Sequence, residues 1–210
     1  MTQHSEKEIA LFEAVLSLIE GGQNPYQMKV SDIAARAGIG KGTVYEYFKS
    51  KEELLCHALW YRIDCELDAV QQAMESAGTF AQMLSALMDA VYHCMRSRAS
   101  LLPMLFTQDR GCDLQAYLNE HQTRLQQVTD RFQALIGHCV AAGVQEGVIA
   151  PQPAPFATAA FFSLLSSLCF LTCRPPSLWG GAIDLPTAKR ICSTLLCESL
   201  KAPHAEVLPS

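Results

Sequence analysis

The sequence predicts an all-α protein of about nine helices. Apolar residues recur at steps of three and four along most of the 210 residues, which is the spacing of one helical face. No stretch of useful length alternates apolar and polar residues as a half-buried strand does. Half of the residues are apolar and 18% are charged, a composition that excludes a disordered chain.

Three of these helices are predicted in the first fifty residues. The first covers residues 5–20, where one apolar stripe runs along the segment. Two short helices follow, over residues 32–37 and 41–48. Ser31 is the expected N-cap of the second helix, and Gly38 is expected to end it.

The rest of the chain continues the helical pattern. Ser50 with Glu53, and Thr79 with Gln82, have the spacing of capping boxes that open two of the helices. The six further helices are expected over residues 51–76, 79–98, 101–108, 113–145, 156–173 and 186–201.

One segment is apolar enough to suggest a membrane span. Between Glu146 and Arg174 lie 27 uncharged residues, long enough to cross a bilayer. The segment opens with three prolines, contains several Ser and Thr residues, and has no basic cluster beside it. We therefore expect a helix covered by protein on all sides. The first residues contain no stretch of signal-peptide type, so a cytoplasmic protein is expected.

The segment 29–48 has the pattern of a helix-turn-helix. Two helices of about two turns each, joined by Gly38-Ile39-Gly40, cannot bury much surface alone. They can hold a fixed angle if their apolar residues share a core with the first helix, and the second of them then lies in the major groove of DNA. The expected core residues are Ile33, Ala34, Ile39, Val44 and Phe48.

Local charge agrees with this interpretation. The chain has a formal charge of −5, but residues 29–51 contain five basic and two acidic residues, a local charge of +3 on a body of −8. Such a patch orients a protein on a duplex, whereas the acidic body does not attract nucleic acid.

Residue type suggests a role for each candidate. The side chains of the second short helix can reach phosphates or base edges, and Gly42 allows a close backbone approach. Lys51 lies beside a helix N-terminus, which favours a phosphate oxygen. Because Glu46 is negatively charged, its carboxylate must either accept a hydrogen bond from a cytosine amino group or point away from phosphate. The candidate DNA-binding residues are Ser31, Arg36, Lys41, Gly42, Thr43, Tyr45, Glu46, Tyr47 and Lys51.

Residues 5–55, and especially the string GIGKGTVYEYFKSKEELL from Gly38 to Leu55, closely resemble the DNA-binding domain of the tetracycline-repressor (TetR) family. The resemblance implies a homodimer, a palindromic operator and repression released by a small molecule. It implies a DNA-binding domain over residues 1–50 and an effector-binding and dimerisation domain over residues 51–202, followed by a flexible tail over 203–210. In family terms, Thr43, Tyr45, Tyr47 and Lys51 occupy the usual DNA-contacting places.

The resemblance also implies an effector cavity, for an apolar or amphipathic ligand. For any single candidate for its lining, a place in the ordinary core is the favoured interpretation. Polar groups that could orient a ligand are Asp89, His93, His121 and Arg124. The pocket candidates are Trp60, Ile63, Met88, Tyr92, Met95, Met104, Phe106, Tyr117 and Phe132.

The last two helices are expected to pack across a dimer axis, as two helices from each chain. The helix over residues 156–173 is apolar all round, and a subunit interface can supply the cover that it needs. The candidate interface residues are Phe161, Phe162, Leu165, Cys169, Ile191 and Leu195.

Other classes of function find less support. The chain lacks G-x-S-x-G, H-E-x-x-H and a phosphate-binding glycine loop, so no enzyme is expected. Its histidines and nine cysteines form no H-x-x-x-H or C-x-x-C pair, and we expect no metal and no cofactor. Two alternatives stay open: a DNA-binding dimer that is ligand-free or responds to cysteine oxidation, and an all-helical carrier or adaptor that does not bind DNA.

Overall fold

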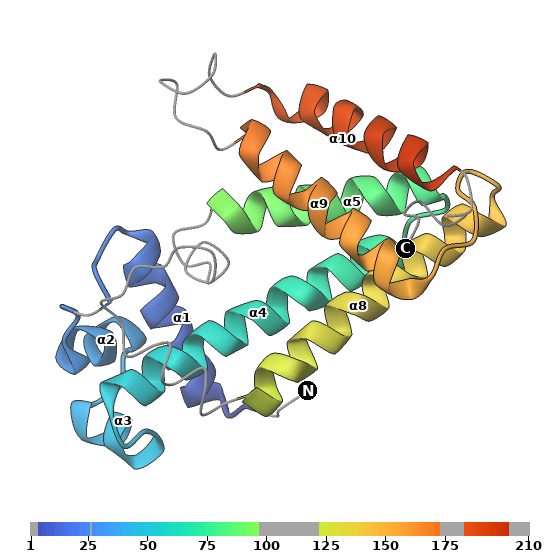
Figure 1. The fold of residues 1–210 in the computed structure, drawn as a ribbon. Coiled ribbons are helices and arrows are strands. Elements are labelled where there is room, and N and C mark those ends of the chain that lie inside the picture. Colours follow the sequence, from blue (N-terminus) through green and yellow to red (C-terminus); the bar gives the residue numbers. More distant parts are fainter. Residues whose placement is uncertain (1–3, 26, 97–121, 173–182, 202–210) are drawn as a thin grey trace, which may run out of the picture. The chain divides into compact units, whose positions relative to one another are not determined.

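The computed structural model describes residues 4–25, 27–96, 122–172 and 183–201, which form eight α-helices and no strand (Figure 1). The predicted all-α class is therefore confirmed. The expected helix over 101–108 and the first part of that over 113–145 lie outside the described residues. The helices are α1 (Glu6–Glu20), α2 (Val30–Ala37), α3 (Lys41–Tyr47), α4 (Lys51–Glu75), α5 (Phe80–Arg96), α8 (Gln122–Gln145), α9 (Ala154–Thr172) and α10 (Leu185–Leu200).

These helices fall into two compact units. Of the described residues, the first unit holds 4–25, 27–66 and 122–125, and the second holds 67–96, 126–172 and 183–201. The first unit thus extends beyond residue 50, because Leu54 and Ala58 of α4 are buried in the same core as α1, α2 and α3.

Phe12 lies at the centre of the first unit and is fully buried. Its ring lies 5.8 Å from that of Phe48, 6.4 Å from that of His57 and 5.4 Å from that of Tyr61. One aromatic cluster therefore joins α1 to the end of α3 and to α4. The buried residues around it include Leu11, Val15, Ile33, Ala34, Val44 and Leu54.

The helix ends in this unit follow the local sequence, with one exception. Gly38 ends α2 with φ +69°, in the left-handed region that glycine adopts without strain. The predicted start of α2 was wrong: the helix begins at Val30 with Lys29 as N-cap, and Ser31 makes no capping bond. The buried side chain of Val30 lies on the same apolar stripe as Ile33, so packing extends the helix backward.

Both predicted capping boxes form with the same variation. The hydroxyls of Ser50 and Thr79 accept from the backbone N–H of Glu53 and Gln82, at 3.0 and 3.3 Å. The side chains of Glu53 and Gln82, however, accept from the residue before each cap: Lys49 N–H at 2.6 Å and Gly78 N–H at 2.8 Å. In the standard motif this side chain accepts from the N–H of the N-cap residue itself. Here it accepts from the N–H of the residue before the N-cap.

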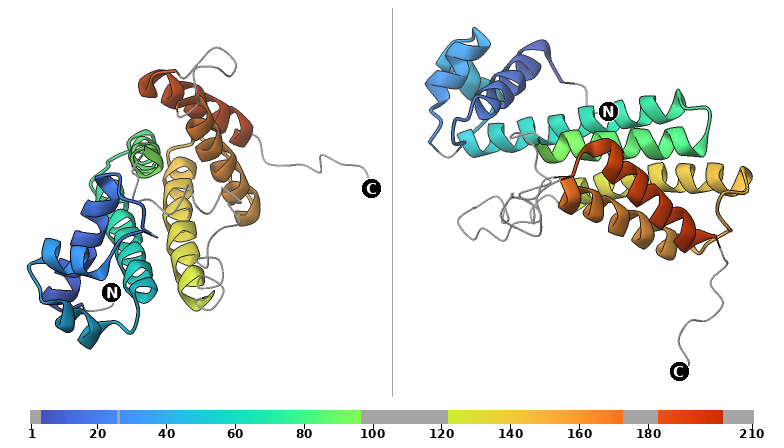
Figure 2. Two further views of the ribbon diagram at one scale, coloured as in Figure 1. Left: turned by 90° about the vertical axis from the view of Figure 1, so that its left-hand side faces the viewer. Right: turned by 90° about the horizontal axis from the view of Figure 1, so that it is seen from above.

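In the second unit, α9 packs against α5 and α10, and α9 and α10 lie side by side in Figures 1 and 2. Phe161 and Leu168 of α9 and Ala188 and Leu200 of α10 are fully buried. Lys189 connects α10 to α5 by two hydrogen bonds. Its Nζ donates to Ser85 Oγ at 2.6 Å and to Asp89 Oδ1 at 2.7 Å.

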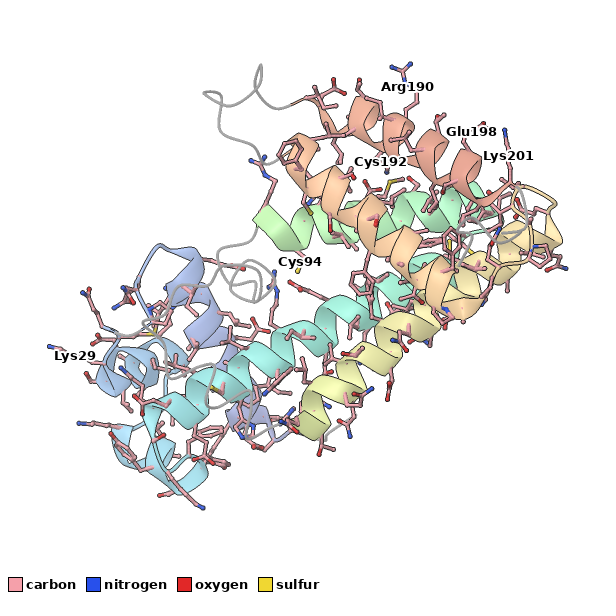
Figure 3. All side chains as sticks on the ribbon, in the orientation of Figure 1. Lys29, Cys94, Arg190, Cys192, Glu198 and Lys201 are labelled. Atoms are coloured by element: carbon pink, nitrogen blue, oxygen red, sulfur yellow. The ribbon has the colours of Figure 1, made fainter. Side chains whose placement is uncertain are left out.

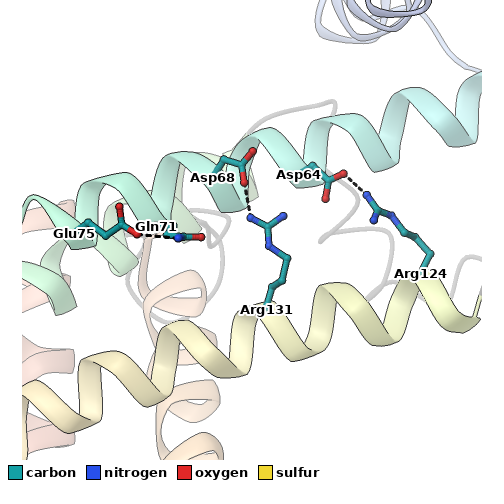
Figure 4. A network of polar contacts seen from close by, with 6 residues as sticks. All are labelled: Asp64, Asp68, Gln71, Glu75, Arg124 and Arg131. Carbon is teal, nitrogen blue, oxygen red and sulfur yellow. Dashed lines mark hydrogen bonds and ion pairs between the residues drawn. The ribbon is translucent and has the colours of Figure 1, made fainter. Parts of the chain in front are cut away.

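Two ion pairs join α4 to α8 (Figure 4). Arg124 pairs with Asp64, and Arg131 pairs with Asp68. The two aspartates are one helical turn apart on α4 and the two arginines are two turns apart on α8. Each pair is partly exposed, so its contribution depends on salt.

α9 is the one helix of the described residues that is long and apolar enough to cross a membrane, with a mean hydropathy of 1.7. Length and composition do not separate a bilayer span from a helix covered by protein. The inner face of α9 is occupied by the core of the second unit.

Two glycines of α8 allow a matched test of this packing. A Cβ at Gly143 would lie 2.8 Å from Phe80 Cδ2 and 3.0 Å from Ile149 Cδ1, whereas a Cβ at Gly137 meets no atom within 4 Å. We expect Gly143→Ala to lower the free energy of unfolding by about 1 kcal/mol, because overpacking outweighs the helix propensity of alanine. Gly137→Ala is expected to raise it by up to about 1 kcal/mol. Urea denaturation measures both, and equal stabilisation by the two changes would contradict the packing described for Gly143.

Candidate nucleic-acid interface

The two faces of α3 differ sharply in exposure. Val44 on α3 and Phe48 at its C-cap are buried, as predicted. Tyr45 and Tyr47 are 51% and 38% exposed. The predicted recognition helix therefore presents both tyrosines outward, and the remaining polar candidates lie with them: Lys41 and Glu46 are exposed and Thr43 is half-buried.

Gly42 lies on this exposed surface, and packing does not explain the missing side chain. No protein atom lies within 4 Å of the position that its Cβ would occupy. Glycine also costs helix stability relative to alanine, by about 1 kcal/mol. A glycine that the fold does not need is compatible with a close approach by a molecule outside the protein.

Arg36 and Ser31 on α2 are both exposed but differ in their partners. The guanidinium of Arg36 donates to Ser17 Oγ of α1 at 2.6 Å, so it ties α2 to α1. The hydroxyl of Ser31 donates to Asp32 Oδ1 at 3.3 Å. Of the two, Arg36 has the clearer structural role, and its contact with DNA stays a prediction.

Two lysines lie near the ends of these helices. Lys51 is partly buried at the first position of α4, with its Nζ 3.9 Å from Glu52 Oε1. Lys29, the N-cap of α2, is exposed and projects outward in Figure 3. Lys29 belongs to the basic segment of residues 29–51, but its place as N-cap was not predicted, since α2 begins two residues earlier than expected.

The pocket candidates in the described residues are distributed between the two units. Trp60 is buried and Ile63 is half-buried in the first unit; Met88 is buried in the second. Tyr92 accepts a hydrogen bond from Arg96 at 3.2 Å. The ring of Phe132 contacts that of Phe162 at 5.4 Å. Met104, Phe106, Tyr117 and His121, and the side chain of Met95, lie outside the described residues.

Two of the polar groups expected to orient a ligand have partners within the protein. Asp89 accepts from Lys189, and Arg124 pairs with Asp64. His93 is exposed. The charge of Asp89 is thus balanced by Lys189 and that of Arg124 by Asp64. A side chain whose charge is already balanced attracts an oppositely charged ligand less strongly.

The interface candidates separate into inner and outer residues. Phe161 and Leu165 are buried in the core of their own unit, so they face away from any partner. Phe162 and Phe170 of α9 and Ile191 and Leu195 of α10 are exposed, Leu195 by 61%. Cys169 is half-buried. A shallow hollow of about 280 Å³ on α10 is lined by Arg190, Ile191, Thr194 and Leu195. We call the exposed residues Phe162, Phe170, Ile191 and Leu195 the outer apolar face.

The buried thiols are poor candidates for redox chemistry. Burial raises the pKa of Cys56 and of Cys139 to about 12, and it raises the pKa of Cys192. A thiol with a raised pKa carries little of the reactive thiolate near neutral pH. Cys173, which follows Cys169 by four residues in the sequence, lies outside the described residues. In the part of the chain that the structure describes, no group of three His, Cys, Asp or Glu residues could hold a metal ion.

Comparison with known proteins agrees with this geometry. Residues 22–58 match the family described as bacterial regulatory proteins, tetR family. The fatty acid metabolism regulator protein of Bacillus subtilis (strain 168) is 22% identical over 150 residues, 71% of this chain and 74% of that protein.

Solved structures share the fold over nearly the whole chain. The transcriptional regulator FadR from Bacillus subtilis, in complex with stearoyl-CoA, superposes with a TM-score of 0.63 at 16% identity and covers 91% of this chain and 98% of its own. A proposed transcriptional regulator from Saccharomonospora viridis, in complex with choline, gives a TM-score of 0.68 at 17% identity, over 94% and 98%. Residues 22–58 thus carry the DNA-binding domain of the tetR family of bacterial regulatory proteins, and the chain has the fold of a TetR-type transcriptional regulator.

Proposed function

We propose that the protein is a homodimeric repressor that binds a palindromic operator through α3 and is released by a small apolar or amphipathic effector. The single observation that carries the proposal is the orientation of α3: Val44 and Phe48 are buried while Tyr45 and Tyr47 are exposed beside Lys41. A short helix held by its apolar face can insert its polar face into the major groove.

The proposed contacts divide by chemistry. Lys29 and Lys51 lie at helix N-termini, where backbone N–H groups add to the attraction for phosphate. These contacts position the protein on the duplex. Lys41, Tyr45 and Glu46 are exposed along α3 and are the residues proposed to reach base edges.

Gly42 tests this surface, because it separates DNA binding from folding. We expect Gly42→Ala to leave the melting temperature unchanged or raise it, since the position has open space and alanine favours a helix by about 1 kcal/mol. The added methyl group is expected to weaken binding to the operator by about tenfold or more, because the backbone can no longer approach the duplex closely. Fluorescence anisotropy with a labelled duplex and thermal unfolding measure the two effects. A Gly42→Ala protein that binds as tightly as the wild type would exclude close approach at this position.

We propose that the outer apolar face forms the dimer contact. Phe162 and Phe170 lie on α9 and Ile191 and Leu195 on the adjacent α10, so each subunit can contribute two helices to a four-helix contact. Large apolar side chains that are this exposed mark a candidate interaction site. The uncharged composition of α9 is explained in the same way.

Selection of DNA from a random pool tests the homodimeric repressor directly. The wild type is expected to enrich sequences whose two half-sites are related by a two-fold axis. Leu195→Glu, which places a charge on the outer apolar face, is expected to give a monomer in analytical ultracentrifugation and to lose affinity for the palindrome. Its circular dichroism spectrum is expected to stay helical, since Leu195 lies outside the core. Enrichment of single half-sites by the wild type would contradict the palindromic operator, and a dimeric Leu195→Glu protein would contradict this interface.

α4 is the proposed link between effector and DNA. Its first part belongs to the unit that contains α3, and its last part belongs to the other unit. The Asp64–Arg124 and Asp68–Arg131 pairs bind α4 to α8. A ligand that favours a different arrangement of α4 and α8 would change the spacing of the two recognition helices and shift the dimer away from DNA.

The effector class is proposed from the apolar candidates and from two proteins of the same fold. One of them was solved with stearoyl-CoA and the other with choline. Buried Met88 and half-buried Phe132, both in the second unit, offer apolar contacts to an acyl chain. Asp89, the carboxylate candidate for a cation such as choline, already accepts from Lys189. We therefore propose an acyl-type effector.

Stearoyl-CoA and choline serve as the two probes. At saturation, stearoyl-CoA is expected to weaken duplex binding by about 5- to 150-fold, the usual range of coupling between two sites. Choline is expected to leave the affinity unchanged. Titration of each probe into the protein–duplex complex, followed by anisotropy, measures the shift. Release by choline alone, or no effect of stearoyl-CoA, would contradict an acyl-type effector.

A further inference from the structure

Glu53 makes two hydrogen bonds in the turn between α3 and α4. Glu53, in the first turn of α4, accepts a hydrogen bond from the backbone N–H of Lys49 at 2.6 Å. Its own backbone N–H donates to Ser50 Oγ at 3.0 Å. Glu53 therefore binds both residues that connect the two helices.

Lys49 is the residue at which the chain leaves α3. It follows Phe48, the C-cap, whose backbone is extended at φ −131° and ψ 131° and whose N–H donates to Val44 O at 3.0 Å. Because the carboxylate holds the amide next to this cap, it fixes the direction in which the chain turns away from α3. In a standard capping box the carboxylate would instead bind the amide of Ser50.

α3 has few other constraints. It has seven residues, of which Val44 is the buried one, and its N-cap, Gly40, supplies no side-chain capping bond. A helix this short is not stable by itself. Its orientation depends on the packing of Val44 and Phe48, on the connection to α2 through Ile39, which packs against the same core, and on the bond from Lys49 to Glu53.

We propose that Glu53 is a positioning residue for operator recognition: it holds the exit of α3 so that Lys41, Tyr45 and Tyr47 point into the groove. This inference rests on the proposed function of α3 and adds a residue that touches no DNA. The positioning role also explains why the negatively charged Glu53 is present close to the surface proposed to bind DNA, which is itself negatively charged.

The sign of the effect separates positioning from charge. Loss of an acidic residue beside a DNA-binding surface should tighten binding, since it removes repulsion from phosphate. Glu52 provides the matched control: it is the neighbouring carboxylate in the same turn of α4, it is 65% exposed, and it lies 3.9 Å from Lys51 Nζ. Glu52→Ala is thus expected to bind DNA as tightly as the wild type or more tightly.

The experiment compares full-length Glu53→Ala, Glu53→Gln, Glu53→Asp and Glu52→Ala on one selected duplex. Glu53→Ala is expected to weaken binding by about tenfold, the loss typical of one hydrogen bond to a charged group. Glu53→Gln keeps an oxygen that can accept from Lys49, and it is expected to recover most of the affinity. Glu53→Asp keeps the charge but moves the carboxylate away from that amide, and it is expected to bind as weakly as Glu53→Ala.

A second measurement does not depend on DNA. Hydrogen exchange of the Lys49 amide in the free protein is expected to accelerate in Glu53→Ala and Glu53→Asp and to stay slow in Glu52→Ala. If Glu53→Ala does not fold, Glu53→Asp decides the matter, since aspartate is well tolerated in the first turn of a helix. Wild-type affinity in Glu53→Asp would overturn the role of Glu53. A wild-type protein that binds no duplex would instead overturn the proposed function.

Discussion

The burial of Val44 and Phe48 against α1 determines the exposed surface of α3. Phe48 lies 5.8 Å from Phe12, ring to ring, and both residues are buried. On a helix of seven residues, one buried face leaves Tyr45 and Tyr47 no position except outside. The hydrophobic contact that stabilises the first unit therefore also determines the surface proposed to bind DNA, so the folding of this unit and the proposed recognition both depend on Phe12.

The second unit combines two surfaces in one pair of helices. The inner residues of α9 and α10, such as Phe161 and Ala188, fill the core, whereas Phe162 and Leu195 are exposed. The exposed side of α9 carries Phe162 and Phe170 together with Ser163, Ser166 and Ser167. The exposed phenylalanines, with Ile191 and Leu195 of α10, are the physical reason for the proposed dimer surface.

Much of the fold could be predicted from the sequence, because helix periodicity and end signals are local. Gly38 ends α2 as expected, and Val44 and Phe48 are core. The details that depend on packing could not be predicted. Burial of Val30 moves the start of α2. The inward direction of Phe161 depends on which side of α9 packs against its neighbours, and Ser163, Ser166 and Ser167, which are exposed on the other side, are the sequence signal for it. The bonds from Arg36 to Ser17 and from Lys49 to Glu53 also depend on how the chain turns.

Hydroxyl-radical footprinting of the tyrosines, with and without a selected duplex, tests the central claim most directly. Tyr45 and Tyr47 are exposed in the protein, so hydroxyl radicals are expected to oxidise both in the absence of DNA. We expect oxidation of both to fall when the duplex is added, while oxidation of Phe162 and Phe170 on α9 stays the same. Tyrosines that remain equally reactive in the complex would contradict the insertion of α3 into the groove.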